Sequence, residues 1–353
     1  MTLFSIVKMF DTHQLLERKK LVDKITSLSH QSPLFDALAL DVFNYQYKYN
    51  VFFSQFCDLI HKNPHQVNSI FQLPFLPITF FKNKTLKTGE WHTETKFLSS
   101  GTTGVITSSH HVMSVDWYNS ITKKAFEIVY GSLKNYCILG LLPAYLERPG
   151  SSLVHMVDYF IKQSEHPKSG FFLYNHSDLK NILEHNAATK TPTILFGVTF
   201  ALLDFVETYT LNLPELIIIE TGGMKGRRRE IIRDELHESL RKGFGTQKIH
   251  SEYGMTELLS QAYLTDIGLF VPSSTMKVLS RDVTDPFKMF NLVPENKKTP
   301  TGALNIIDLA NIDTCSFIAT DDLGKVHPNG SFEVLGRMDN SDVRGCALLM
   351  VNG

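Results

Sequence analysis

The stretch that decides the fold is Leu98-Ser99-Ser100-Gly101-Thr102-Thr103-Gly104, where four hydroxyl side chains and two glycines fall within seven residues. A segment this poor in apolar side chains forms neither a stable helix nor a central strand. Glycine lets a backbone approach a phosphate closely, and consecutive N–H groups form a concavity that binds anions. A solvated turn has the same composition, so the loop predicts an anion site only where other motifs agree.

The segment before the loop is predicted to be mainly helical. Over residues 11–63, apolar side chains recur at helical spacing, among them Leu15, Leu16, Leu21, Ile25, Leu28, Phe35, Leu38, Leu40, Phe43 and Tyr47. Prolines then mark an irregular stretch, with a buried turn or strand at residues 76–81. Residues 95–98 are predicted to form a short strand that enters the loop.

The segment after the loop predicts an α/β fold. A helical pattern covers residues 112–130, and apolar runs follow at 136–142, 193–198 and 216–219. Each run ends at turn residues, as buried parallel strands covered on both faces do. Residues 227–242 are predicted to form an amphipathic helix. After about residue 265 the pattern changes to short strands separated by turns. The turns are predicted at 299–302, 322–325 and 328–331.

Composition excludes several classes of protein. The 353 residues carry 35 basic and 36 acidic side chains, so no global basic field attracts nucleic acid. No run of 18 apolar residues predicts a membrane span, and residues 1–10 do not form a signal peptide. Cys57, Cys137, Cys315 and Cys346 lack zinc or disulfide spacing, which favours free thiols in a reducing cytoplasm. Most of the 25 phenylalanines are expected in the core, although an apolar tunnel could also use them.

A second motif spans residues 250–257 and contains Tyr253, Gly254, Thr256 and Glu257. A tyrosine beside a glycine can stack on a planar base, and a carboxylate can hold Mg²⁺ that bridges phosphates. The alternative is a strand end followed by a helix that Thr256 caps.

Three shorter motifs complete the pattern. Glu220–Gly226 follows an apolar strand and precedes a helix, where open α/β sheets bind ligands, although a plain β-to-α turn has the same pattern. Asp322 in the segment 319–324 could hold ribose hydroxyls, or it belongs to a solvated Asp-rich turn. Arg337, in Gly336–Asp339, follows a predicted strand at 332–335, and a solvated turn is again the alternative.

The order of these five motifs over residues 98–339 resembles the adenylate-forming superfamily of acyl-CoA synthetases, luciferases and peptide-synthetase adenylation domains. The segment 142–154 and the tail that bears Cys346 are similar to the narrower LuxE-like acyl-protein synthetase family of bacterial luminescence. The resemblance implies the large N-terminal domain of that superfamily: stacked, mostly parallel sheets flanked by helices, with a small β-rich subdomain at 265–335. An adenylating domain at 1–335, with a helical part at 1–63, would precede a hinge-like tail at 336–353.

The resemblance also implies a reaction with ATP and Mg²⁺, in which a carboxylic acid becomes an acyl-adenylate and pyrophosphate leaves. The loop would wrap the β- and γ-phosphates through Ser99, Ser100, Gly101, Thr102, Thr103 and Gly104. Tyr253 and Gly254 would pack on adenine, Thr256 would contact the α-phosphate, and Glu257 would hold Mg²⁺. The remaining nucleotide contacts would come from Gly222 and Gly223 at the acyl and nucleotide pocket, Asp322 at the ribose hydroxyls, and Arg337 near the ribose.

The sequence lacks lysines at positions where the superfamily usually has them to bind phosphate. Ile106-Thr107 stands where the phosphate loop usually ends in a Pro-Lys pair, and residues 336–345 contain no lysine. His110 and His111 could help to bind the phosphates, but we expect both histidines to lie on the surface. The small C-terminal lid domain with its catalytic lysine is absent from this sequence, so Lys225, Arg227 or a partner protein would neutralise the leaving group.

In the luminescence family a cysteine near the C-terminus carries the acyl group as a thioester, which here implies Cys346. Arg344 could lower the pKa of that thiol, although a small apolar residue in an edge strand is the alternative. The expected activity is that of an ATP-dependent fatty acid–protein ligase, with a long-chain acid as substrate and an acyl reductase or another acyl-accepting protein as partner. The alternatives are an acyl-CoA or aryl-CoA ligase and a degenerate nucleotide-binding partner protein.

Overall fold

The computed structural model describes residues 12–99, 107–142, 150–222, 231–265, 268–291 and 299–338. Three helices begin the described chain: α1 (Thr12–Ser27), α2 (Phe35–Tyr49) and α3 (Val51–Leu59). They confirm the helical prediction, but the buried face of α1 is narrower than the apolar pattern suggested. Leu21 and Ile25 are buried, whereas Leu15 and Leu16 are 40% and 56% exposed.

A short irregular region joins these helices to the loop. It contains the 3-10 helix η1 (Ile70–Gln72), strand β1 (Leu76–Pro77) and helix α4 (Phe80–Asn83). Strands β2 (Thr95–Leu98) and β3 (Ser109–Val112) then form a separate antiparallel pair. The predicted strand at 95–98 is therefore confirmed, and the loop joins it to β3.

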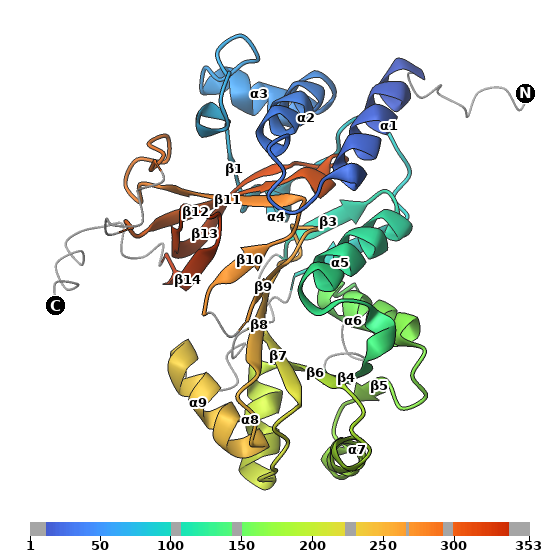
Figure 1. Ribbon diagram of the computed structural model, residues 1–353. Coiled ribbons are helices and arrows are strands. Elements are labelled where there is room, and N and C mark those ends of the chain that lie inside the picture. The colour runs from blue at the N-terminus through green and yellow to red at the C-terminus, as the bar shows by residue number, and fades with distance from the viewer. Residues whose placement is uncertain are drawn as a thin grey trace, which may run out of the picture.

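The larger sheet contains a parallel half, in the order β5-β4-β6-β7-β8. Its strands are β4 (Cys137–Leu141), β5 (Gly170–Phe172), β6 (Thr193–Val198), β7 (Ile217–Thr221) and β8 (Ile249–Tyr253). Helices α5 (Val115–Tyr130) and α6 (Ser152–Ser164) cover one face, and α8 (Thr199–Thr208) and α9 (Arg233–Phe244) cover the other (Figure 1). The 3-10 helix η2 (Leu133–Asn135) precedes β4, and α7 (His176–Ala188) packs beside β5.

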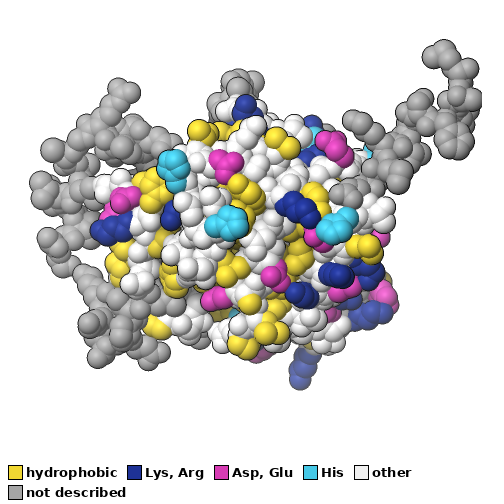
Figure 2. Space-filling view, turned by 90° about the horizontal axis from the view of Figure 1, so that it is seen from above, with side chains coloured by type: hydrophobic (Ala, Val, Ile, Leu, Met, Phe, Trp, Pro, Cys, Tyr) yellow, Lys and Arg dark blue, Asp and Glu magenta, His cyan; other side chains and the backbone are white. Residues whose placement is uncertain are grey.

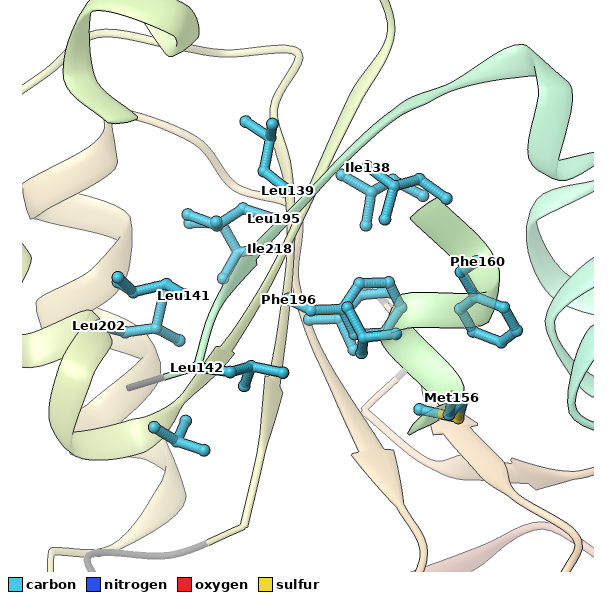
Figure 3. Close-up of a cluster of buried hydrophobic side chains, with 14 of the residues drawn as sticks. Ile138, Leu139, Leu141, Leu142, Met156, Phe160, Leu195, Phe196, Leu202 and Ile218 are labelled. Atoms are coloured by element: carbon cyan, nitrogen blue, oxygen red, sulfur yellow. The ribbon is translucent and has the colours of Figure 1, made fainter. Parts of the chain in front are cut away.

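Burial on both faces explains why the apolar runs in this half are continuous. Every residue of β4 and β6 is buried. Figure 3 shows Leu139 and Leu195 pointing to one side of the sheet and Ile138 and Phe196 to the other, where Phe160 of α6 meets them. The predicted buried parallel strands are thus confirmed.

The other half of the larger sheet is mainly antiparallel and continues in the order β9-β10-β14-β13-β12-β11, with β1 parallel to β13. Its strands are β9 (Ala262–Leu264), β10 (Phe270–Pro272), β11 (Met276–Arg281), β12 (Gly302–Asp308), β13 (Phe317–Val326) and β14 (Phe332–Arg337), with the 3-10 helix η3 (Leu309–Asn311) after β12. Helices α1–α3 lie near this half at the top of Figure 1. The α/β class is confirmed, and the described strands join β5 to β11 in one continuous mixed sheet.

Three local predictions differ from the structure. The helix predicted at 227–242 is observed as α9, which begins at Arg233 and ends at Phe244. Residues 231–232 are not helical, and residues 227–230 lie outside the described residues. The predicted turn at 322–325 lies inside β13, and Gly336 and Arg337 lie inside β14. Tertiary pairing overrides the turn-like composition at both places, because β13 and β14 hydrogen-bond to each other.

No helix in the described part of the chain is long and apolar enough to cross a membrane. On the face seen from above in Figure 2, basic and acidic side chains are interspersed with apolar ones. That face carries no basic stripe of the kind that binds nucleic acid.

Candidate active site

Three of the predicted site residues meet where β8, β13 and β14 lie close together. The Tyr253 hydroxyl donates to Asp322 Oδ2 over 2.7 Å, and Arg337 Nε donates to Asp322 Oδ1 over 3.2 Å. Burial and the neighbouring Asp322 carboxylate raise the pKa of Tyr253 well above its usual value, so the phenol keeps its proton. The structure therefore joins the second, fourth and fifth motifs in the space around one carboxylate.

The Tyr253 ring is held from the side by aromatic neighbours. It makes edge contacts with Phe270 at 5.8 Å and Phe332 at 5.3 Å between ring centroids. The geometry of such contacts fixes the plane of a tyrosine ring.

The chain after β8 turns without forming a helix, so the alternative interpretation of this motif, a helix capped by Thr256, is wrong. Side chains from the interior hold this turn instead. Asn311 Nδ2 donates to the Glu257 carbonyl over 2.8 Å, and His110 Nδ1 lies 2.8 Å from the Thr256 carbonyl. Asp308 accepts the backbone N–H groups of the two residues at 259–260 at 2.8 and 3.0 Å. The backbone of the Thr256–Glu257 segment is thereby fixed on several sides.

The carboxyl group of Glu257 is buried beside the base of the glycine-rich loop. Burial raises the pKa of Glu257, while a hydrogen bond to Ser108 and the charges of Arg337 and Lys82 act in the opposite direction. A buried carboxylate that is incompletely neutralised suits a cation. The described residues contain no cluster of three or more metal-binding side chains.

Ser99 and Ser108 close the base of the loop. Ser108 N–H donates to Ser99 Oγ over 2.8 Å, and Ser99 N–H donates to the Ser108 carbonyl over 3.0 Å. Ser100, Gly101, Thr102, Thr103 and Gly104 lie outside the described residues. Ser108 therefore bonds both to Ser99 at the start of the predicted phosphate loop and to the Glu257 side chain.

The expectation that His110 and His111 are surface residues is wrong for His110. Its side chain is 1% exposed, with an edge contact to Phe81, whereas His111 is only partly buried. Burial lowers the pKa of His110 to about 4, so the imidazole is neutral near pH 7. Strand β3 directs positions 110 and 112 inward, as its period of two requires, and the buried Ser108 just before it continues the alternation. That alternation is the signal in the sequence from which the burial of His110 could have been predicted.

The third motif begins at the carboxyl end of β7 as predicted. Gly222 has φ of +61°, which favours glycine, and its carbonyl accepts from Thr199 Oγ1 over 3.2 Å. Gly223 and Lys225 lie outside the described residues, as does Arg227.

A buried polar group beside this turn was not predicted. Glu220 Oε1 accepts from Ser251 Oγ over 2.6 Å, and His237 Nε2 lies 3.2 Å from the same hydroxyl. Burial alone would raise the pKa of Glu220, but hydrogen bonds from His237 and Ser251 lower it below its ordinary value. Glu220 and Ser251 pair across β7 and β8, two residues before Gly222 and Tyr253 respectively. This buried group therefore lies beneath the ends of β7 and β8, where the two turns begin.

Glu252 lies on the opposite face of β8 from Tyr253. Its Oε2 accepts from Thr221 Oγ1 over 2.6 Å, and burial raises the pKa of Glu252 to about 7. A Cβ at Gly254 would lie 2.2 Å from Glu252 Oε1, so this position requires glycine while Glu252 keeps its place. The absence of a side chain at Gly254 is thus explained by the nearby Glu252 carboxyl as well as by the close approach expected for adenine.

Cys57, Cys137 and Cys315 are buried and unpaired. Burial raises the pKa of each of these thiols, that of Cys315 to about 12, so all three are inert. Cys346 and Arg344 lie outside the described residues.

An open recess of about 610 Å³ lies beside α9, apart from this site. Its lining includes Arg233, His237, Arg241, Glu333 and Leu335, and it includes none of the predicted site residues.

Solved structures with a similar fold are adenylate-forming enzymes. Against 2-hydroxyisobutyryl-CoA ligase in complex with 2-HIB-AMP and CoA, the TM-score is 0.61 at 12% identity, covering 86% of this chain and 68% of that one. Against ATP-bound MatB from Rhodopseudomonas palustris, the TM-score is 0.50 at 15% identity, covering 72% of this chain and 49% of that one. The chain thus spans about half the length of MatB, and at these identities the likeness establishes the fold.

No curated protein matches the chain by sequence. The model of one protein family does match, over residues 22–353, and its description is acyl-protein synthetase, LuxE. The match covers most of the chain and includes every motif described above, so the protein belongs to the LuxE acyl-protein synthetase family.

Proposed function

We propose that this protein uses ATP to activate a carboxylic acid, a long-chain fatty acid, and passes the acyl group to a protein thiol. The observation that carries the proposal is the meeting of Tyr253, Asp322 and Arg337 near the Thr256–Glu257 turn and the base of the Ser/Gly loop. A planar ring, an acceptor for hydroxyls, a buried carboxylate and a loop of N–H groups are the contacts that a magnesium nucleotide needs.

In the first step a carboxylate oxygen of the acid bonds to the α-phosphorus, the bond from that phosphorus to the bridging oxygen breaks, and pyrophosphate leaves. Tyr253 and Gly254 would pack on the adenine, and Asp322 would accept from the ribose hydroxyls with Arg337 beside it. Because Asp322 already accepts from Tyr253 and Arg337, its orientation is set before the nucleotide binds.

The phosphates would lie between the loop and the turn. Ser99 to Gly104 would donate to the β- and γ-phosphates, while Thr256 would contact the α-phosphate. Mg²⁺, held by Glu257, would neutralise phosphate charge when it is bound. Gly222 and Gly223 would let the nucleotide and the acid approach the backbone, and Lys225 is our candidate for the missing phosphate-binding cation.

In the second step the Cys346 thiolate would attack the acyl carbonyl carbon. The bond from that carbon to the adenylate oxygen breaks, AMP leaves, and a thioester remains for transfer to an acyl reductase or another acceptor protein. The thiol loses its proton before the attack, because the thiolate is the nucleophile. Unpaired thiols at Cys57, Cys137 and Cys315 favour a reducing compartment, the cytoplasm, as the place of this chemistry.

The first test is the acid-dependent exchange of labelled pyrophosphate into ATP, across matched panels of fatty and aryl acids. We expect exchange with long-chain acids, and its loss in Glu257→Gln. Exchange with aryl acids alone would contradict the fatty substrate, and no exchange with any acid in the presence of an acceptor protein would contradict adenylation.

The second test is a hydroxylamine-labile acyl label. We expect wild type to carry it after incubation with ATP and a labelled acid, and Cys346→Ser to lose it while keeping the exchange reaction. A label retained in Cys346→Ser, or acyl transfer to coenzyme A without any protein label, would favour a CoA ligase.

A further inference from the structure

Two buried polar residues at the end of the Ser/Gly loop, Ser108 just before β3 and His110 within it, face the Thr256–Glu257 turn. The Ser108 backbone N–H donates to Ser99 Oγ at the base of the loop, and the Ser108 side chain bonds to the Glu257 side chain. His110, two residues further on the same face of the strand, bonds to the Thr256 carbonyl at 2.8 Å. The loop and the turn are therefore joined through two inward-facing residues at the start of one short strand.

The hydrogen bonds of His110 fix its tautomer. A carbonyl oxygen only accepts, so the nitrogen that contacts Thr256, Nδ1, carries the proton. Nε2 then has a free lone pair, and it accepts from the Thr314 hydroxyl over 3.0 Å. Burial keeps the imidazole neutral, and in this orientation both of its ring nitrogens have a hydrogen-bond partner.

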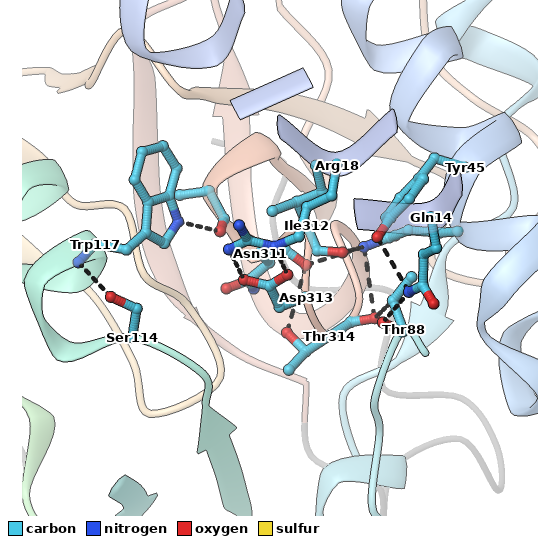
Figure 4. Close-up of polar contacts among 12 residues, drawn as sticks. Gln14, Arg18, Tyr45, Thr88, Ser114, Trp117, Asn311, Ile312, Asp313 and Thr314 are labelled. Atoms are coloured by element: carbon cyan, nitrogen blue, oxygen red, sulfur yellow. Dashed lines mark hydrogen bonds and ion pairs between the residues drawn. The ribbon is translucent and has the colours of Figure 1, made fainter. Parts of the chain in front are cut away.

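Thr314 is itself anchored to the N-terminal part of the chain. Its carbonyl accepts from Asn50 Nδ2 at 2.8 Å and from Thr88 Oγ1 at 2.7 Å. The preceding residue, Asp313, forms a two-point ion pair with Arg18 of α1 at 2.6 and 2.7 Å. Figure 4 shows this connected group, with Arg18, Thr88, Asp313 and Thr314 drawn together. His110 is thus held against a rigid support on the side away from the turn.

Asn311, from the same supporting segment, donates to the next carbonyl along the turn, that of Glu257. Two consecutive carbonyls are therefore held by two interior donors. Fixing two adjacent carbonyls fixes the two peptide planes on either side of the Glu257 Cα, and with them the direction in which the Glu257 side chain leaves the backbone.

We infer that His110 is a positioning residue for adenylation: its Nδ1–H holds the Thr256 carbonyl and thereby sets the orientation of Glu257 relative to Ser108. This inference rests on the proposed function, because it assigns the turn to the α-phosphate and to Mg²⁺. The residue does not contact the reacting atoms itself. It acts through the Thr256 carbonyl, so its loss alters the rate of the chemical step more than the affinity for the acid.

Two substitutions separate positioning from simple packing. The Asn side chain places its Nδ2 donor as many bonds from Cβ as His Nδ1, so His110→Asn keeps a donor for the Thr256 carbonyl. The Gln side chain fills the cavity better than Asn does. Its Nε2 donor, however, is as many bonds from Cβ as His Nε2, so it takes the place of the nitrogen that faces Thr314 and not of the one that faces Thr256. A role in packing alone favours Gln over Asn, whereas a positioning role favours Asn over Gln.

The experiment measures kcat and the KM for the acid in pyrophosphate exchange, with thermal unfolding of each variant as a record of folding. His111→Asn is the matched control, because it changes the adjacent outward-facing histidine. We expect His110→Gln to lose roughly 10- to 100-fold in kcat with little change in KM. We expect His110→Asn to stay within a few-fold of wild type, even where it unfolds at a lower temperature.

Equal kcat values for the two variants, or a higher value for Gln, overturn the inference while exchange in wild type upholds the proposed function. If wild type binds Mg·ATP but does not exchange, calorimetry replaces kinetics, and weaker Mg·ATP binding by Gln than by Asn supports the positioning role. Equal affinities overturn it. A wild type that neither exchanges nor binds Mg·ATP overturns the proposed function, and the inference with it.

Discussion

The Tyr253 hydroxyl donates to Asp322 over 2.7 Å, although 69 residues separate the two in the chain. The contact joins the carboxyl end of β8 in the parallel half of the sheet to β13 in the antiparallel half. The candidate nucleotide site therefore lies where the two halves of one continuous sheet meet.

This contact predicts separable effects on nucleotide binding. Asp322→Ala removes the acceptor for Tyr253 and, as we propose, for the ribose hydroxyls, so we expect the KM for ATP to rise roughly 10- to 100-fold. Tyr253→Phe keeps the ring and loses only the hydroxyl, so we expect a rise of a few-fold. Pyrophosphate exchange at varied ATP measures both. Asp321→Asn, on the other face of β13, is the control, and an equally large effect there would contradict the assignment.

The buried carboxylate of Glu257 predicts a dependence on Mg²⁺. Glu257→Gln keeps the shape of the side chain and removes its charge, so we expect exchange to fall about 100-fold. The Mg²⁺ concentration for half-maximal exchange should rise as well. Glu238→Gln on the surface of α9, where Glu238 pairs with Arg241 and Lys242, is the control. An unchanged Mg²⁺ requirement in Glu257→Gln would assign the ion to other ligands.

Glu252 predicts a stability that depends on pH. Its pKa rises from an ordinary value of 4.5 to about 7 in the folded protein, so the folded state holds a proton that the unfolded state has released. Stability from this group is present at low pH and is lost as pH rises from about 4.5 to about 7. Glu252→Gln stays neutral, so it should exceed wild type at pH 8 by up to about 3 kcal/mol and differ little at pH 5.

Chemical denaturation at the two pH values measures this difference. Glu238→Gln again serves as the control, because its charge is exposed and its effect should not change between pH 5 and pH 8. A stability difference for Glu252→Gln that is the same at both values would mean that Glu252 is ionised throughout this range.

The cysteines predict a simple pattern of thiol reactivity. Cys57, Cys137 and Cys315 are buried with raised pKa values, so a thiol reagent should reach none of them quickly in the folded protein. If Cys346 carries the acyl group, we expect one fast thiol in wild type and none in Cys346→Ser. Four thiols should react after unfolding, and a fast thiol that persists in Cys346→Ser would contradict this assignment.

Gly324 predicts how the antiparallel half supports the site. A Cβ at this position would lie 2.0 Å from the Glu333 carbonyl, a backbone atom of β14 that cannot yield cheaply. Gly324→Ala should lower the thermal midpoint and also weaken ATP binding, because Asp322 and Arg337 are paired across the same two strands. Gly170→Ala, with open space around its Cβ, is the control and should change neither quantity.

Much of the parallel half could be predicted because its signal is local. Each apolar run lies within a few residues and ends at a turn, and burial on both faces leaves no alternation to misinterpret. The buried face of α1 was overestimated, because periodicity shows which side of a helix is apolar but not how much of that side another element covers.

The sequence by itself determined the family, the α/β class and the order of the site motifs, since each depends on residues close together in the chain. Only the tertiary structure decided that Asp322 lies in a strand, that His110 is buried against the Thr256 carbonyl, and that Asn311 holds Glu257. The last two contacts span 146 and 54 residues. Local sequence propensity does not distinguish a solvated turn from a buried pair at such separations in the chain. The partner that excludes water comes from another part of the chain.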